Sequence, residues 1–184
     1  MKKTTIISAL ALSFMMLLSF NADAQKFPPL DKSPMDAASF PSSYKESNKI
    51  VRIIYSRPQL KGRSIEKLVP QGEVWRTGAN EAAEITFYYP MLVAEKEIEA
   101  GTYTFYLKRE KDVWYGMLST DLNVWGSYFY NDKNTVAEFR IPEMKDDTEI
   151  EAFSIMFRDS GSTEETSMLI GWGNTRLEIP FKKL

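Results

Sequence analysis

The sequence predicts an all-β fold, an antiparallel β-sandwich of two sheets, on three observations. Apolar and polar residues alternate along most of the chain after Asn48, which is the pattern of a half-buried strand. Short groups of Asn, Asp, Gly, Ser and Pro separate these stretches, as turns require. No stretch beyond the N-terminal segment sustains a helical period. The pattern leaves a jelly-roll order and an immunoglobulin-like order of strands equally open.

Residues 1–24 have the organisation of a secretory signal peptide. Two lysines follow Met1, an apolar run extends from Ile6 to Phe20, and an A-x-A cleavage site ends at Ala24. The run is short for a membrane-spanning helix, and no later stretch is apolar for long enough to span a bilayer. We therefore expect cleavage after Ala24 and export, periplasmic or secreted, with no membrane span left after signal removal.

Residues 25–47 are rich in Pro, Ser and Asp, and we expect an extended N-terminal wrap along the domain edge. Within them, Ser33 followed by Pro34 predicts the start of a short helix, because Ser is a favoured N-cap and Pro a favoured first helical residue. Residues 48–184 are expected to form a single β-sandwich domain. The chain contains no Cys, so its core would hold it together without disulfides.

The alternating stretches predict about nine strands, rich in β-branched and aromatic residues. They cover residues 51–55, 85–89, 103–108, 113–118, 125–130, 137–141, 153–157, 168–172 and 177–181. The turns expected between them include residues 95–96, 110–112, 131–134, 142–147, 159–162 and 173–174.

One long segment, Tyr55 to Phe87, lacks a simple hydrophobic period. Such a segment inside a compact domain is more often functional than a short turn is. Gly62 indicates a turn within it. Residues 64–69 predict one short helical turn, with Ser64 as the N-cap and Pro70 directly after its end.

The same segment carries the candidate ligand-binding residues. Three guanidinium groups would form a multi-donor receptor for a carboxylate, sulfate or phosphate, and a tryptophan beside them would stack on a sugar. The alternative is structural: the arginines pair with Glu66, Glu73, Glu81 or Glu84 and pin the segment to the sheet. The candidates are Arg57, Arg63, Trp75, Arg76, Asn80 and Glu81.

Several short motifs in this segment resemble the signature of a bacterial family, the domain of unknown function 2911 family. The motifs are YSRP, KGR, LVP, VWRTGANEA and, further on, AGTY. Gln71 departs from the pattern, because an aromatic residue is expected before the glycine. The resemblance covers nearly all of the chain after the signal and implies its fold and its export. The family has no established activity, so the resemblance supplies no catalytic residues.

The absence of His and Cys excludes several chemistries. Serine and cysteine triads with histidine, and the usual zinc and copper sites, are ruled out. No nucleotide-binding motif is present, so no cofactor is expected. The mildly acidic chain, without a basic tail, argues against nucleic acid as a partner. Paired carboxylates remain as a catalytic option, with Glu81 as the acid or base.

Two further features receive a structural interpretation. Calcium is compatible with the oxygen donors of residues 131–134 and 159–162, but both segments have the composition of turns, and no metal site is predicted. Trp75 and Trp125 lie off the alternating apolar phase, and core packing is the favoured role for both.

These observations favour an exported, non-enzymatic binding or envelope-interaction module. Its expected partner is a small anion, a saccharide such as an acidic glycan, or an envelope protein, bound through the segment from Arg57 to Glu81. Two alternatives stay open: a carboxylate-dependent glycan hydrolase, and a purely structural module with an internal Arg/Glu clamp.

Overall fold

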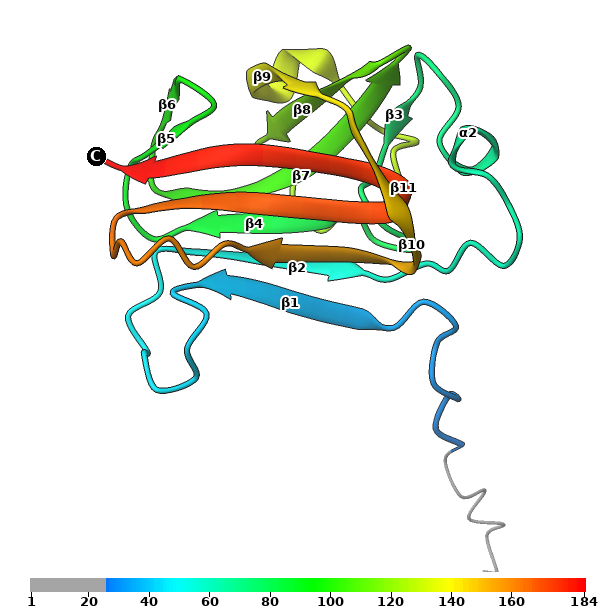
Figure 1. Ribbon diagram of the computed structural model, residues 1–184, viewed down its shortest axis with the longest axis horizontal. Helices are drawn as coiled ribbons and strands as arrows, with labels where there is room; N and C mark the ends of the chain where they lie inside the picture. Colours follow the sequence, from blue (N-terminus) through cyan, green and yellow to red (C-terminus); the bar gives the residue numbers. More distant parts are fainter. Residues whose placement is uncertain (1–25) are drawn as a thin grey trace, which may run out of the picture. The chain divides into compact units, whose positions relative to one another are not determined.

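A computed structural model describes residues 26–184 of the chain. The signal peptide predicted for residues 1–24 lies outside the described residues. Residues 31–184 form one compact unit, separate from the chain before Asp31. Within that unit the prediction of an all-β, antiparallel two-sheet sandwich is confirmed (Figure 1).

The first sheet has seven strands in the order β1-β2-β4-β7-β8-β9, with β3 paired to β7. All of its pairs are antiparallel. Its strands are β1 (Met35–Phe40), β2 (Val51–Ser56), β3 (Val74–Trp75), β4 (Ala83–Phe87), β7 (Gly101–Glu110), β8 (Val113–Ser119) and β9 (Thr135–Pro142).

The second sheet has the order β10-β11-β5-β6 and lies across the first (Figure 1). Its strands are β5 (Met91–Val93), β6 (Lys96–Ile98), β10 (Met144–Phe157) and β11 (Glu165–Lys183). The only helical elements among the described residues are short: α2 (Ile65–Leu68) and the 3₁₀ turn η1 (Asp132–Asn134). The helical turn predicted over residues 64–69 is therefore confirmed as α2.

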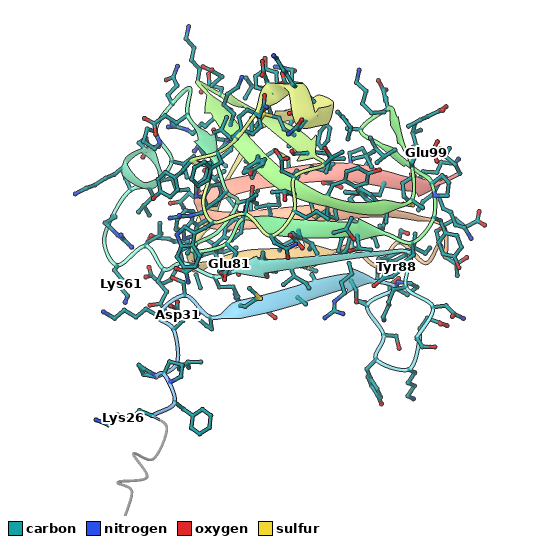
Figure 2. All side chains as sticks on the ribbon, turned by 180° about the vertical axis from the view of Figure 1, so that it is seen from behind. Lys26, Asp31, Lys61, Glu81, Tyr88 and Glu99 are labelled. Carbon is teal, nitrogen blue, oxygen red and sulfur yellow. The ribbon has the colours of Figure 1, made fainter. Side chains whose placement is uncertain are left out.

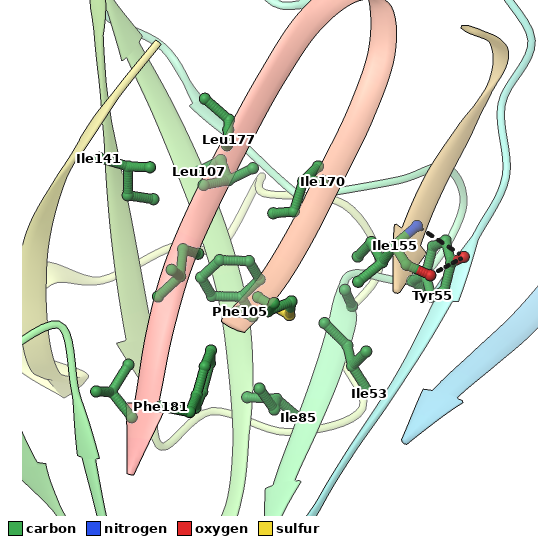
Figure 3. Close-up of a cluster of buried hydrophobic side chains, with 14 of the residues drawn as sticks. Ile53, Tyr55, Ile85, Phe105, Leu107, Ile141, Ile155, Ile170, Leu177 and Phe181 are labelled. Carbon is green, nitrogen blue, oxygen red and sulfur yellow. Dashed lines mark hydrogen bonds between the residues drawn. The ribbon is translucent and has the colours of Figure 1, made fainter. Parts of the chain in front are cut away.

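Strand β11 doubles back on itself at Gly173. The amide of Lys183 donates to the carbonyl of Glu164 at 2.8 Å, which requires the two ends of this long strand to lie side by side. Gly173 has φ +52°, a conformation suited to the first central residue of a tight hairpin turn. The turn predicted at residues 173–174 is thus present, and both legs are visible in Figures 1 and 3.

The two sheets are closed along one edge by direct hydrogen bonds. The chain after β2 pairs with β10, where the amide of Leu60 donates to Glu151 O at 3.0 Å and the amide of Phe153 donates to Pro58 O at 2.9 Å. The buried hydroxyl of Tyr55 accepts from the amide of Ile155 at 2.9 Å and donates to its carbonyl at 3.2 Å (Figure 3). Burial raises the pKa of Tyr55, so this hydroxyl stays protonated.

Side chains from both sheets fill one hydrophobic core. Alternate residues of β2, β4, β7 and β11 point into it, including Ile53, Ile85, Phe105 and Ile170 (Figure 3). The ring of Phe181 packs there against Phe87, with 5.9 Å between the ring centroids. This alternation is the pattern on which the strand predictions depended.

Three local predictions are wrong. The helix expected at Ser33-Pro34 does not form, because these residues lead into β1, which pairs with β2 along its whole length. The turn expected at residues 142–147 is replaced by the start of β10, with Glu143 as the single residue between β9 and β10. Residues 125–130, expected as a strand, form a loop of turns in which Gly126 has φ +71°.

Candidate functional site

The motif VWRTGANEA forms a strained turn between β3 and β4, which we call the signature turn (residues 75–82). Thr77, Gly78 and Asn80 have φ angles of +55°, +152° and +60°. A β-branched residue such as Thr is a clear outlier at positive φ, and strain of this kind gathers where the surrounding structure fixes a functional geometry. Thr77 is fully buried, so the strained residue lies inside the fold.

A second segment, distant in sequence, is hydrogen-bonded to the signature turn. We call residues 122–129 the aromatic loop. The amide of Gly126 donates to Asn80 O at 3.0 Å, and the amide of Ala82 donates to Val124 O at 3.0 Å. Glu81 and Trp125 form an isolated antiparallel bridge. The turn and the loop therefore form one structural unit at the same end of the sandwich as Lys61, opposite Tyr88 and Glu99 (Figure 2).

A small second hydrophobic cluster anchors the aromatic loop to the outer side of the first sheet. Ala82, Tyr106 and Met117 are buried there, beneath Val124 and Tyr130. The rings of Tyr106 and Tyr130 meet edge to face, with 5.2 Å between their centroids. Burial, with a smaller effect of Asp121, raises the pKa of Tyr106 to about 12. The loop is thus fixed on both flanks of its exposed part.

The middle of the aromatic loop exposes large apolar side chains. Phe129 is 81% exposed, Tyr128 76% and Trp125 54%. Single exposed hydrophobic residues need no explanation, but several within one short, anchored loop indicate an interaction site.

Arg76 lies beside this loop without an ionic partner. No ion pair and no side-chain hydrogen bond involves Arg76 within residues 26–184. It lines a hollow of about 150 Å³, the Arg76 hollow, together with Glu73, Trp75 and Tyr128. A methyl group on Gly126 would lie 3.3 Å from Nη1 of Arg76 and 2.7 Å from the ring of Tyr128, so both side chains approach this glycine.

The other two arginines are held elsewhere, and the expected three-arginine receptor is wrong. Arg57 donates to Asp36 at 3.0 Å, to the carbonyl of Phe153 at 3.1 Å and to the hydroxyl of Ser154 at 2.8 Å. Its carboxylate partner is on β1, whereas the sequence suggested a glutamate of the same segment. These bonds join β1, the chain after β2 and β10.

Arg63 stabilises its own loop. Its guanidinium donates to the carbonyls of Leu60 at 2.8 Å and Gln59 at 2.7 Å, and no carboxylate pairs with it among the described residues. Arg63 therefore contacts other residues than Arg57 and Arg76 do, and the three guanidinium groups share no common partner.

Trp75 contributes mainly to the core. Its ring stacks on Trp172, with 5.5 Å between centroids and 10° between planes, and meets Phe153 edge to face at 5.0 Å. The face against Trp172 is closed to a sugar, and a platform for stacking is provided by the exposed Trp125 instead.

Glu81 and Asn80 lie on the other flank of the signature turn. Asn80 holds the aromatic loop through its backbone carbonyl. Glu81 is exposed and lines a hollow of about 180 Å³ together with Glu84, Asn123 and Tyr55. One carboxylate oxygen of Glu84 accepts from the amide of Asn123 at 2.7 Å, which fixes its orientation. Two carboxylates therefore share this smaller, mainly apolar hollow.

The aromatic loop was not predicted as a functional element, because residues 125–130 were expected to form a strand. Tyr128 and Phe129 are adjacent and both exposed, which breaks the alternation assumed for a strand. Core packing, the role favoured for Trp125, is wrong: Trp125 is 54% exposed, and the positive φ of the neighbouring Gly126, +71°, bends the chain there.

Within residues 26–184, no group of three or more acidic side chains is arranged to hold a metal ion. The two segments considered for calcium form turns, in which Asn131 accepts from Lys133 N and Asp159 from Gly161 N. In the same part of the chain, no helix combines the length and the apolar character needed to cross a membrane.

The fold and the site define a β-sandwich protein with an aromatic loop braced by a strained turn. A family model described as Protein of unknown function (DUF2911) matches residues 33–181. The chain therefore belongs to this family, as the resemblance of its motifs suggested. The comparison with curated proteins finds no match, and neither does the comparison with solved structures.

Proposed function

We propose that the protein is an exported, non-enzymatic binding module that takes an acidic saccharide at the aromatic loop and the Arg76 hollow. The observation that carries the proposal is a guanidinium group with no ionic partner in residues 26–184, in a hollow that the exposed ring of Tyr128 borders. Export is supported by the signal-like sequence of residues 1–24.

The ligand class follows from the chemistry of the two parts. Trp125 and Tyr128 offer broad apolar surfaces for the ring of a sugar, at a small cost in side-chain entropy. Arg76 offers several donors that match a carboxylate or sulfate group. Because the loop is hydrogen-bonded to the signature turn, the site is largely formed before binding, which favours affinity. A small free anion would use Arg76 alone and bind more weakly.

The proposal is tested by calorimetric titration with uronic-acid oligosaccharides and with neutral oligosaccharides of equal length. Arg76→Gln should weaken binding of the acidic series by about tenfold, the effect of one lost charged hydrogen bond. Tyr128→Ala should weaken both series. Arg140→Gln is the matched control, because Arg140 is an exposed arginine on β9. Equal affinities for wild type and Arg76→Gln, or no binding by wild type, would refute the proposal.

A second candidate function is glycan hydrolysis in the hollow that Glu81 shares with Glu84. The specific observation in its favour is the pairing of two carboxylates in one hollow, since glycosidases use two such groups. Turnover of a glycan by wild type, lost in folded Glu81→Gln, would replace the binding proposal. Activity that persists in Glu81→Gln would remove this carboxylate from the mechanism.

A further inference from the structure

A second concave region lies on the outer side of the second sheet, on a different part of the fold from the aromatic loop. A hollow of about 440 Å³, which we call the outer groove, lies between the first residues of β10 on one side and the later residues of β10 with β11 on the other. This volume is within the range of small-molecule sites, and it exceeds that of either hollow beside the signature turn.

The walls of the outer groove combine aliphatic side chains with charged ones. Met144, Ile150, Met156 and Leu169 line it, and none of its lining residues, all within the described chain, is aromatic. Met156 is 57% exposed and Met144 45%, so unpaired apolar surface faces solvent here. A wall without aromatic rings is poorly suited to sugar stacking, whereas flexible methionines adapt to an alkyl chain.

A glycine determines how one end of the groove closes. A methyl group on Gly171 would lie 2.6 Å from Cδ1 of Ile150, so the absence of a side chain lets Ile150 rest on the sheet. Arg176 holds the first residues of β10 in place by donating to the carbonyl of Thr148, and its donation to the carbonyls of Gly173 and Thr175, at 2.9 Å each, fixes the guanidinium group on β11. These bonds already use the guanidinium group of Arg176.

Arg158 differs from Arg176 in its position and in the number of hydrogen bonds that its guanidinium group makes. It lines the outer groove and also an adjoining hollow of about 380 Å³. Its side chain has one ionic partner among residues 26–184, Glu178 at 3.0 Å, and is 53% exposed. A guanidinium group has five N–H donors, so Arg158 keeps several for an anionic group at the end of the groove.

We propose that the outer groove binds a free single-chain amphiphile with an anionic head, such as a fatty acid. The alkyl chain lies along the four aliphatic residues, and the carboxylate meets Arg158 where the two hollows join. Charge complementarity favours an anionic head, because three basic and two acidic side chains line the groove. Among the basic ones, Arg158 is engaged by one carboxylate, that of Glu178.

The probes are dodecanoate, dodecyl maltoside and dodecyltrimethylammonium, each below its micelle-forming concentration, titrated calorimetrically into the mature chain. Dodecanoate should bind saturably with one site per chain. Met156→Asp, an exposed position whose change spares the core, should weaken dodecanoate and dodecyl maltoside by at least about tenfold, or about 1.4 kcal/mol. Arg158→Gln should weaken dodecanoate by about tenfold and leave dodecyl maltoside unchanged.

Matched controls separate this site from the aromatic loop. Arg140→Gln and Tyr128→Ala should leave dodecanoate binding unchanged, whatever the saccharide titrations show. Absence of saturable dodecanoate binding, or equal affinities for wild type and Met156→Asp, would overturn the proposal. Binding to anionic phospholipid vesicles without binding to monomeric dodecanoate would also overturn it, in favour of a membrane surface as the partner.

Discussion

Replacement of Gly78 by alanine tests whether the signature turn also stabilises the fold. Gly78 has φ +152°, and a methyl group there would lie 2.9 Å from the carbonyl oxygen and 3.3 Å from the amide nitrogen of Ser56. Both atoms belong to the backbone at the end of β2, which cannot move aside as a side chain does. Gly62 supplies the control, because its φ is +70° and nothing lies within 4 Å of the added methyl group.

The two substitutions differ in the clash, and the conformational cost is at least as large at Gly78 as at Gly62, because φ +152° lies outside the left-handed α region. Alanine at the φ of Gly62 costs about 1 kcal/mol, which is the whole effect expected for Gly62→Ala. The clash at Gly78 adds about 2 kcal/mol, a typical value for overpacking, so Gly78→Ala should lose at least about 3 kcal/mol. With a urea slope of about 2 kcal/mol/M, the midpoints should fall by about 0.5 M for Gly62→Ala and by at least about 1.5 M for Gly78→Ala.

Urea unfolding followed by far-ultraviolet circular dichroism measures both midpoints. The slope should stay constant across the three proteins, because a change in slope would signal an altered unfolded or native state. If Gly78→Ala loses no more stability than Gly62→Ala, the close packing of the signature turn on β2 contributes nothing, and the structural role inferred for it is wrong.

Two further predictions concern charged groups. Arg76→Gln should change the free energy of unfolding by less than about 0.5 kcal/mol, because Arg76 has no ionic partner in residues 26–184; a larger loss, measured by urea unfolding, would assign it to an internal clamp. Burial, the largest single effect, raises the pKa of Glu143, but hydrogen bonds from Lys145, Thr175 and Trp114 together bring it below its ordinary value of 4.5. A lowered native pKa stabilises the fold above the unfolded-state pKa, so wild type should lose stability as the pH falls below 4.5, more steeply than Glu143→Gln in urea titrations at each pH.

The strands were predictable wherever alternation matched burial. In β9 and in both legs of β11, every second residue points into the core, so a period of two identified the strand and its inner face. The order of strands was not predictable, because alternation says which face is buried and nothing about which strand is the neighbour. The pairing of the chain after β2 with β10, for example, joins Gln59 to Ala152 across a large sequence separation.

The candidate site was predictable only in part, for a related reason. The irregular segment and its turns depend on residues that are close together in the sequence, so the sequence motif could indicate them. The partners of its arginines are not local: Arg57 pairs with Asp36 on β1, and Arg76 lies beside Gly126. These contacts could not be predicted from the glutamates that lie close in sequence, because both depend on how the strands of the first sheet are assembled.

The strain in the signature turn bears on what the turn is for. Thr77 adopts a conformation that costs a β-branched residue about 1 kcal/mol or more, in a chain that has no disulfide to offset the loss. Packing of Gly78 on β2 does not need a threonine at positive φ one residue earlier. The geometry does direct Asn80 O to the amide of Gly126, and so places the aromatic loop beside Arg76. The strain is therefore better explained by the position of the loop than by the stability of the fold, which is why binding is proposed here.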